Sequence, residues 1–566
     1  MAGRPRPSCG GPSNVLSVPA GRTRPDPADA IVVGSGAAGG WAAKTLSEAG
    51  LSVLVLEAGP EVFPEDVKSS GPLRMAKRFA RVASGRQRMQ GFHPAYWSSD
   101  PDLWIDDASE PITTPAGYPY NWFRSSLVGG RTLTWGGVCL RLSDYEMESA
   151  SREGFGFDWP IRSRHLAAAF ERIEEALGVH GTRDGLPQLP DGRYLEPHPL
   201  TASEMKLREA VERTWPERRL IPCRGIDGTE APQAGRAWNR LSSCGSSLAD
   251  ALATGRTTLL PCSLVTHLVV DGSGRRARGV RYIDKRTGGW EEAEARIIVL
   301  CASALSSVLI LLRTAADRPG GPLDEAGTLG RYIMDHVYTG SMVSIAGVPY
   351  HAPYPRTGAD SFLIPRYQNL ATRTDAFRGG FGVWGAIQRE GFSGRRWSNS
   401  AIGFMVAHGD MEPRPENRIE LGPGRDAWGL PVPHIDCRLS ENDTAMREAM
   451  RASIAEMLDK AGGRMRSLFG FLDFPGPWRM VARLEKGWHE PPPGSSTHEV
   501  GGARMGEDPG TSVVDPRNRC WGLPNVLVTD GACWPTAGWQ NSTLTVMAVT
   551  VRACELAVQS LNAREL

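Results

Sequence analysis

The sequence lacks an excess of charge of either sign. Over 566 residues, 64 basic side chains nearly balance 63 acidic ones, and the formal net charge is +1 at pH 7. Proteins that hold nucleic acid or anionic membranes electrostatically usually carry a basic surplus. The balance therefore removes the electrostatic argument for either partner and favours a small molecule as substrate.

Paired cysteines are also absent. Ten cysteines are scattered along the chain without a CxxC pair or a Cys/His cluster at metal-ligand spacing, so no metal site is predicted. A chain of this length can bury a large core without disulfide bonds. We therefore expect mostly buried free thiols and a reducing, cytoplasmic setting.

Long hydrophobic runs are missing as well. No window of about eighteen apolar residues is evident, which predicts that no segment spans a bilayer. Residues 1–28 mix Pro, Gly, Ser and Arg without an apolar run typical of a signal peptide, and we expect them to form a disordered leader.

The length exceeds what one core usually covers, so two domains are expected.

A dinucleotide-binding motif follows this leader. The apolar run at 30–33 predicts a buried strand, the stripe of Ala38, Trp41, Ala42 and Leu46 predicts a helix, and residues 53–57 predict a second strand.

Between the first strand and the helix stands Gly34-Ser35-Gly36-Ala37-Ala38-Gly39, a GxGxxG motif in its required context. Its glycines allow a tight turn, close approach of a pyrophosphate, and helix–strand packing. Glu57 ends the second strand, where its carboxylate is expected to accept hydrogen bonds from the ribose and to repel a 2′-phosphate. The alternative is a Gly-rich turn in a purely structural βαβ unit. Because strands of this type return only after residue 260, FAD is favoured over NAD.

The rest of the chain has a coarser pattern. A helix is expected over 163–177 with Ser163 as N-cap, loops over 180–245, and a meander of strands over 263–300 that leads into a helix near 304–313. Residues 340–440 show no helical period, and a strand at 526–529 precedes a final helix.

Two residues near the C-terminus carry candidate redox chemistry. His498 lies among small residues and has an ordinary pKa near the working range, so it is expected to take a proton from an alcohol at neutral pH. Asn541 directly precedes the final helix, where an Asn is usually only an N-cap. It is expected instead to donate a hydrogen bond to the same substrate oxygen. Sequence spacing does not establish that the two side chains meet.

Taken in order, the motifs of this chain resemble those of the glucose–methanol–choline (GMC) oxidoreductases, and more closely the bacterial sugar-oxidising, pyranose-oxidase-like members. The matching segments are Gly34 to Gly39 with Glu57, Val128-Gly-Gly-Arg-Thr-Leu-Thr-Trp-Gly136, Phe157-Asp-Trp-Pro160, Gly330-Arg-Tyr-Ile-Met-Asp-His336, residues 498–508 and residues 525–545.

This resemblance implies a bound FAD and hydride transfer from an alcohol carbon, with His498 as base and Asn541 beside it. Some pyranose oxidases attach FAD covalently through a His in the segment that corresponds to 132–135; this chain has Thr134 there, so non-covalent FAD is expected. The family's usual Pro after the catalytic Asn is Ser542 here. The cofactor-binding residues implied by the motif and the resemblance are Gly34, Ser35, Gly36, Ala37, Ala38, Gly39, Glu57, Ala58, Gly129, Gly130, Thr134, Gly136, Gly137, Leu264, Val265, Asp530, Gly531, Asn541, Ser542 and Thr543.

The expected fold class is α/β, α+β overall, with a Rossmann-like FAD-binding domain built from residues 29–150, 245–335 and 495–566. A substrate domain on an antiparallel sheet is expected from 151–244 and 336–494. The resemblance favours a carbohydrate-like alcohol such as a sugar, glycoside or aminoglycoside intermediate in secondary metabolism. Trp97, Trp384, Trp539 and Gln540 are candidate substrate contacts, although buried packing is the commoner role for any one of the seventeen tryptophans.

Three alternatives remain open at this point. Electrons could pass to oxygen, as in an oxidase, or to a quinone or protein acceptor, as in a dehydrogenase. A lyase on the same fold would hold an idle flavin. A flavin-bound structural or regulatory protein would show no turnover. The substrate, the hydroxyl oxidised and the oligomeric state are left undetermined by the sequence.

Overall fold

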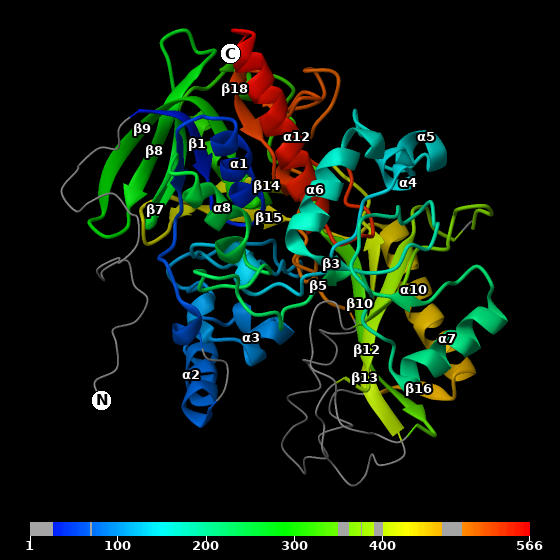
Figure 1. The fold of residues 1–566 in the computed structure, drawn as a ribbon. Helices are drawn as coiled ribbons and strands as arrows, with labels where there is room; N and C mark the ends of the chain where they lie inside the picture. The colour runs from blue at the N-terminus through cyan, green and yellow to red at the C-terminus, as the bar shows by residue number, and fades with distance from the viewer. Residues whose placement is uncertain are drawn as a thin grey trace.

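The computed structural model describes residues 27–67, 71–348, 361–374, 376–389, 400–466 and 490–565, and in these residues the chain forms two large sheets. Figure 1 shows them side by side, with the strands β1, β8 and β9 at the upper left and β10, β12 and β13 at the lower right. Most of the predicted leader, 1–26, lies outside the described residues.

The first sheet has a parallel core. Its strand order in the described residues is β17-β18-β9-β1-β2-β6; β8 also pairs antiparallel with β9, and β7 pairs antiparallel with β8. The strands are β1 (Ala28–Val33), β2 (Val53–Leu56), β6 (Thr257–Leu260), β7 (Ser263–Val270), β8 (Ala277–Asp284), β9 (Gly289–Leu300), β17 (Arg519–Cys520) and β18 (Leu523–Val528). They come from the beginning, the middle and the end of the chain.

Both faces of this parallel core are buried. Ala30, Val32 and Val53 face a cluster with α1 (Ala37–Glu48), α8 (Ser247–Ala253) and α12 (Thr543–Asn562), and Ile31 and Val33 face the larger core. A strand covered on both sides needs apolar residues at every position, which explains the unbroken run at 30–33. This α/β arrangement confirms the predicted fold class.

The second sheet is antiparallel, with the order β16-β10-β13-β12-β11-β4. Its strands are β4 (Ile221–Pro222), β10 (His336–Ala346), β11 (Phe362–Ile364), β12 (Phe381–Ile387), β13 (Ser400–Asp410) and β16 (Gly463–Arg466). Helices α7 (Ala202–Thr214) and α10 (Glu441–Lys460) pack on one face. The other face is directed toward the first sheet, and alternate side chains of β10, β12 and β13 point that way.

The remaining elements are short. They are α2 (Pro72–Ala83), α3 (Pro94–Ser98), α4 (Asp144–Met147), α5 (Ser149–Glu153), α6 (Ala167–Leu177), α9 (Ala304–Ala316), the hairpin β14 (Arg418–Arg425) and β15 (Pro431–Asp436), the pair β3 (Val179–His180) and β5 (Gly225–Ile226), and 3₁₀ turns at Pro64–Asp66, Gln90–Phe92, Pro101–Leu103, Gly130–Leu133, Ser163–His165, Ser243–Gly245, Pro322–Asp324 and Gly531–Cys533.

Several sequence-based expectations need correction. Ser163 begins a 3₁₀ turn, and α6 starts only at Ala167 without a side-chain cap. The segment 180–245, expected as loops, contains α7 with a Thr201–Glu204 capping box. The region 340–440, for which no element was predicted, supplies most of the antiparallel sheet. Its Gly and Pro residues interrupt the alternation of apolar residues that would have indicated strands. The meander expected over 263–300 is confirmed, with a turn between the end of β8 at Asp284 and the start of β9 at Gly289.

Two further expectations concern the apolar content. By length and hydropathy α12 could cross a membrane, contrary to the prediction, but 67% of the window that meets the criteria is buried inside the fold. Among the residues that the structure describes, eight cysteines are free and seven of these are buried, as expected. Cys262 is the exception, because it takes part in a disulfide bond.

Candidate active site

A large cavity runs between the two sheets, with a volume of about 1650 Å³. Its walls include the loop after β1 at one end, the cavity face of β10, β12 and β13 at the other, and the start of α12 between them. Pockets for drug-sized ligands usually measure roughly 300–1,000 Å³. This cavity therefore has room for a dinucleotide together with a substrate.

At the nucleotide end, the loop after β1 turns sharply into α1. Gly34 has φ of +98°, and a Cβ at this position would lie 2.5 Å from the carbonyl oxygen of Cys301. A Cβ on Gly39 would lie 1.9 Å from the carbonyl oxygen of Gly34, so only glycine allows this approach of helix and strand. The sequence-based roles of these two glycines in turning and packing are confirmed.

The N-terminus of α1 opens onto the cavity. Its N-cap, Gly36, makes no side-chain cap, the first turn carries no acidic residue, and Gly36, Ala37 and Ala38 line the cavity wall. Uncapped backbone N–H groups at a helix N-terminus bind phosphate oxygens and place partial positive charge beside them. This end of the cavity therefore fits a diphosphate.

Glu57 stands beside this turn. Its Oε2 accepts hydrogen bonds from the backbone N–H and the hydroxyl of Ser35 at 3.0 and 2.7 Å, and Oε1 accepts the N–H of Gly59 at 2.9 Å. Burial raises the pKa of the Glu57 carboxyl, while these hydrogen bonds act in the opposite direction. The carboxylate is thus held rigidly at the cavity wall.

Most of the predicted cofactor-binding residues line this cavity. Those that do are Gly34, Ser35, Gly36, Ala37, Ala38, Glu57, Ala58, Gly130, Thr134, Gly136, Leu264, Val265, Asp530, Gly531, Asn541, Ser542 and Thr543. Gly39, Gly129 and Gly137 do not, and they serve the backbone instead. Gly129, for example, has φ of +94° and donates its N–H to the Ser35 hydroxyl at 2.9 Å.

At the opposite end, the structure brings His498 and Asn541 together. The Nδ2 of Asn541 lies 3.4 Å from the Nε2 of His498, and both residues line the cavity. Two atoms at this separation can both reach one oxygen at ordinary hydrogen-bond distances of about 2.9 Å. The N-cap of α12 is Ser542, which makes no side-chain cap. The Asn541 side chain is therefore directed at the imidazole and is not a cap.

The His498 loop is fixed by two charged residues from distant segments. The carboxylate of Asp335 accepts the backbone N–H of Ser496 at 2.9 Å and that of His498 at 3.0 Å. Arg131 donates to the carbonyl oxygen of Thr497 at 2.9 Å and pairs with the buried Glu499 at 2.8 Å. The imidazole therefore projects from an anchored backbone.

The imidazoles of three histidines meet at this end of the cavity; those of His336 and His408 are buried, and that of His498 is half-buried. His336 on β10 and His408 on β13 have stacked rings with centroids 5.1 Å apart, and the ring of His498 is edge-on to both at 4.8 and 5.4 Å. Burial, and then the neighbouring imidazoles, lowers the pKa of His498 well below its usual range. The expectation of a pKa near the working range is therefore wrong, because the sequence did not reveal the burial. His498 remains a neutral imidazole with a free lone pair at neutral pH.

The imidazole nitrogens of these three residues lie within 4.8 Å of one another, a donor set that could hold a divalent metal ion. No metal was expected from the sequence. A metal at this point would take the lone pair of His498, so metal binding and proton acceptance exclude each other at this residue.

Two of the predicted substrate contacts do not face the cavity. Trp539 is 2% exposed and packs in a core cluster with Leu363, and Gln540 is 1% exposed. The Nε2 of Gln540 donates to the carboxylate of Glu146 at 3.0 Å. The expectation that these side chains touch substrate is thus corrected, because the turn before Asn541 directs them into the protein.

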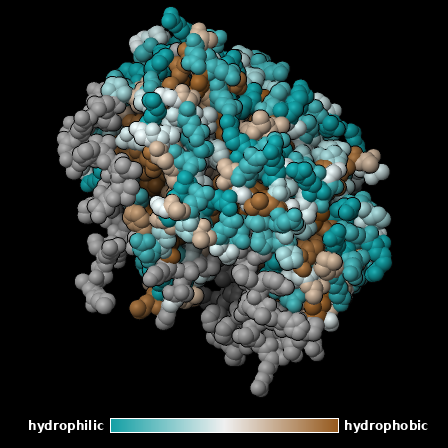
Figure 2. Space-filling model, viewed as in Figure 1, coloured by the Kyte–Doolittle hydropathy of each residue, from teal (hydrophilic) through white to brown (hydrophobic). Residues whose placement is uncertain are grey.

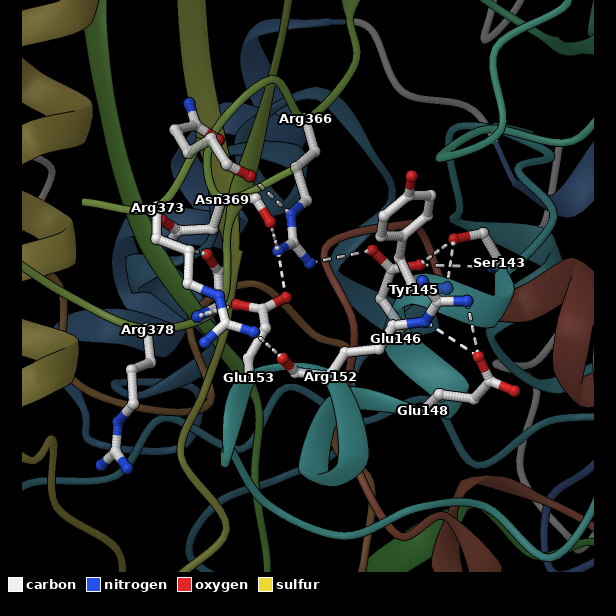
Figure 3. A network of polar contacts seen from close by, with 12 residues as sticks. Ser143, Tyr145, Glu146, Glu148, Arg152, Glu153, Arg366, Asn369, Arg373 and Arg378 are labelled. Carbon is white, nitrogen blue, oxygen red and sulfur yellow. Dashed lines mark hydrogen bonds and ion pairs between the residues drawn. The ribbon is translucent and has the colours of Figure 1, made fainter. Parts of the chain in front are cut away.

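Glu146 belongs to a buried polar network that Figure 3 shows from close by. Its carboxylate accepts from the hydroxyl of Ser143 at 2.5 Å and from Arg366 at 3.4 Å, and Arg366 also pairs with Glu153. Glu146 and Arg366 are both almost completely buried. Gln540 is therefore bound to a rigid, charge-compensated cluster, which holds the turn that presents Asn541.

Trp384 and Trp97 do line the cavity, as predicted. Trp384 on β12 lies edge-on to Phe404 of β13, with ring centroids 5.2 Å apart, and His408 and Tyr338 stand on the same wall. The wall opposite α12 thus combines aromatic faces with polar tips, a surface suited to an amphipathic ring.

Sequence reasoning missed the residues that assemble this site. Asp335 and His336 end a motif that had been matched but given no role, and Arg131 lies in another. His408 had no sequence signal, because its position depends on the register of β13 against β10, where it stands opposite Tyr338.

Comparisons with known proteins identify related domains in two parts of the chain. Residues 29–106 match a family model described as "FAD binding domain", and residues 413–550 match one described as "GMC oxidoreductase". The chain is similar to a 2-methyl-1,2-propanediol dehydrogenase of Mycolicibacterium austroafricanum, with 27% identity over 94% of this chain and 95% of the relative. It is also similar to a paromamine 6'-oxidase of Streptomyces fradiae, with 26% identity over 95% and 92%.

Among solved structures, the fold is similar to that of pyridoxine 4-oxidase from Mesorbium loti. The TM-score is 0.59 at 20% identity, covering 93% of this chain and 98% of the other.

The fold and the matched domains together define an FAD-dependent oxidoreductase that acts on alcohol groups. More particularly, residues 413–550 match the GMC oxidoreductase family model, and relatives of 26–27% identity cover 94–95% of this chain.

Proposed function

We propose that this enzyme oxidises a CH–OH group of a carbohydrate-like substrate, with His498 as the proton acceptor and Asn541 as a hydrogen-bond donor to the same oxygen. The observation that carries this assignment is the 3.4 Å separation of the two side-chain nitrogens at the cavity wall. Bound FAD would supply the redox chemistry by accepting a hydride from the carbinol carbon.

The residues at the nucleotide end would hold that cofactor. The N–H groups at the start of α1 would bind the diphosphate, Glu57 would accept from the ribose, and the backbone around Leu264 and Val265 would meet the adenine. Non-covalent binding is the corresponding expectation at Thr134. In this assignment the parallel sheet forms the cofactor domain and the antiparallel sheet the substrate domain.

His498 would receive the hydroxyl proton on its Nε2. The lowered pKa of His498 favours a neutral imidazole, which is a competent acceptor because its lone pair is not already protonated. Asn541 would donate its amide N–H to the same oxygen and so orient the hydroxyl, and the Gln540–Glu146 contact holds the turn that presents Asn541. Both groups are half-buried and line the cavity, where a bound substrate would reach them.

The carbohydrate assignment rests on the cavity wall and on the relatives. Trp384, Tyr338 and His408 offer aromatic faces beside polar tips, which suits a ring with hydroxyl groups. The two named relatives act on a small diol and on an aminoglycoside. A sugar, a glycoside or an aminoglycoside intermediate is the substrate class that we would test first.

The proposal has two forms, which differ in the acceptor of the electrons from the reduced flavin. Oxygen would make the enzyme an oxidase, whereas a quinone or a protein acceptor would make it a dehydrogenase; the relatives include both kinds. Oxygen consumption with peroxide release, compared with dye reduction, distinguishes them. A lyase with an idle flavin is the candidate outside net redox chemistry.

The decisive experiment is an anaerobic screen of sugars, glycosides and aminoglycosides for bleaching of the flavin absorbance, followed by the mass of the product. Loss of two hydrogens from the substrate together with bleaching is expected. Product formation without bleaching would support the lyase, and a complete lack of turnover with every alcohol class would contradict the proposal.

A further inference from the structure

Helix α2 (Pro72–Ala83) carries its hydrophobic side outward. Leu73 is 86% exposed, Phe79 56% and Met75 41%, and Phe92, which closes the next turn, is 53% exposed. These are four of the eight large apolar side chains that are exposed in the described part of the chain, and the other four lie apart from one another in sequence. Clustered exposure of this kind marks an interaction site.

The cationic side of α2 faces the protein. Arg78 is 1% exposed and donates to the carbonyl oxygen of Ser99, and Lys77 and Arg81 both pair with Asp102. A surface helix normally turns its charges outward. The reversed arrangement keeps the apolar ridge in solvent, although it could have been buried by a rotation of the helix.

The surrounding charge is strongly one-sided. Residues 71–93 contain six basic side chains and no acidic one, in a chain whose overall net charge is only +1. The basic side chains are Arg74, Lys77, Arg78, Arg81, Arg86 and Arg88. Only three carboxylates pair with these basic side chains, those of Asp100, Asp102 and Asp106. A local positive surplus therefore flanks the apolar ridge.

Helix α2 lies on a convex part of the surface. In Figure 1 it projects from the lower left of the molecule, and its neighbours in the fold are the short turns Gln90–Phe92 and Pro101–Leu103. Figure 2 shows brown, hydrophobic atoms at the same corner. The ring of Phe79 lies 5.0 Å from that of Trp97, and Trp97 and Phe92 both line the large cavity. The ridge is thus continuous with the cavity wall.

We propose that α2 and the adjoining Phe92 dock on an anionic lipid surface. The apolar side of α2 would insert at the headgroup boundary, while the exposed Arg86 and Arg88, which follow the helix, would meet lipid phosphates. A second copy of the chain fits less well, because a standard interface uses about 20–30 residues a side, and this ridge offers four large side chains on a convex helix. Docking in this way places the cavity wall beside the bilayer.

The test is co-sedimentation of the FAD-loaded enzyme with phosphatidylcholine vesicles, with and without phosphatidylglycerol. Binding to the anionic vesicles is expected, with weaker binding in high salt and to neutral vesicles. The double variant Leu73→Asp/Phe79→Asp should partition at least about tenfold less, because two large apolar side chains no longer insert. The matched control Trp290→Asp, at a 52% exposed tryptophan on β9, should bind like the wild type.

Sugar-dependent flavin bleaching without vesicles should be unchanged in the double variant, since neither residue lines the cavity. This readout separates failure of lipid docking from failure of the proposed function, and it also shows that the variant is folded. Arg88→Glu, which leaves the apolar ridge intact, should weaken binding to anionic vesicles only.

Wild-type enzyme that stays in the supernatant with anionic vesicles would overturn the proposal, as would equal binding by the double variant. Sedimentation equilibrium without lipid provides a further check. A wild-type dimer that the double variant converts to monomer would assign the ridge to a second copy of the chain instead.

Discussion

At the nucleotide end of the cavity, Gly34, Ser35 and Glu57 come from one βαβ unit, and Ser35 donates to Glu57 through hydrogen bonds of 2.7 and 3.0 Å. At the reacting end, His408, His498 and Asn541 come from a strand of the other sheet, an anchored loop and a helix start. The nucleotide end depends on backbone geometry and small side chains. The reacting end depends on packing between distant segments, which buries imidazoles and changes their acidity.

This difference implies different responses to substitution. A change in the βαβ unit should prevent cofactor binding, because a few glycines admit no side chain. A change at the reacting end should leave the cofactor bound and affect the chemical step. The following predictions test this separation, beginning with the largest expected effect.

Gly39→Val should abolish FAD binding. The new Cβ would stand 1.9 Å from the carbonyl oxygen of Gly34, so the helix would have to move away from the phosphate-binding turn. The measurement is the flavin content of the purified protein. Gly272→Val is the matched control, because a Cβ at that position meets nothing within 4 Å. Full flavin content in Gly39→Val would show that the two ends are not built as described.

His498→Ala should retain FAD and reduce the rate of flavin reduction at least about a hundredfold, the scale of the loss of a general base. Rapid-mixing absorbance under anaerobic conditions measures this rate. His434→Ala, at a histidine on β15 outside the cavity, serves as the control and should react normally. Near-normal reduction by His498→Ala would refute its role as proton acceptor.

Gln540→Leu should lower kcat about tenfold with little change in KM, because the side chain positions Asn541 through Glu146 and does not touch substrate. The exposed Gln559→Leu on α12 is the control. Steady-state kinetics with a confirmed substrate distinguishes a positioning role of Gln540 from direct contact with the substrate. A large rise in KM with constant kcat would restore the sequence-based assignment of Gln540 as a substrate contact.

Acid should destabilise the reacting end. Burial lowers the pKa of His336 to about 4, so between pH 6.5 and 4 the unfolded chain binds a proton there that the folded protein does not. Above pH 6.5, titration of His336 therefore does not change the free energy of unfolding. As the pH falls below 6.5, it lowers the free energy of unfolding increasingly.

His336→Asn should reduce the slope of unfolding free energy against pH by up to about 1.4 kcal/mol per pH unit in this window. Denaturant titrations of wild type and variant at several pH values measure the two slopes. Identical slopes would mean that His336 is not kept neutral by burial.

Local patterns determined the nucleotide end well. The positions of β1, α1 and β2 followed from an apolar run, a helical stripe and a second run, since both faces of these strands are buried. The GxGxxG glycines and Glu57 were identified because their function depends on spacing within one unit. The helix near 304–313 and the meander over 263–300 were found for the same reason.

The reacting end was only partly predictable. His498 and Asn541 were identified by motif, but the pKa of His498 was misjudged because the sequence does not show how many imidazoles surround it. Trp539 and Gln540 were assigned to substrate because they neighbour Asn541, whereas the turn sends them to Glu146 and the core. His408 and Asp335 had no assigned role, because strand register and loop anchoring join residues far apart in the chain.

The sequence by itself determined a βαβ unit, an FAD-type motif and two chemically competent side chains, because each depends on interactions between near neighbours along the chain. Only the tertiary structure decided which side chains share the cavity, which histidines are kept neutral, and that α2 exposes its apolar side. These properties arise from the packing of two sheets and their connecting segments, which no local pattern encodes.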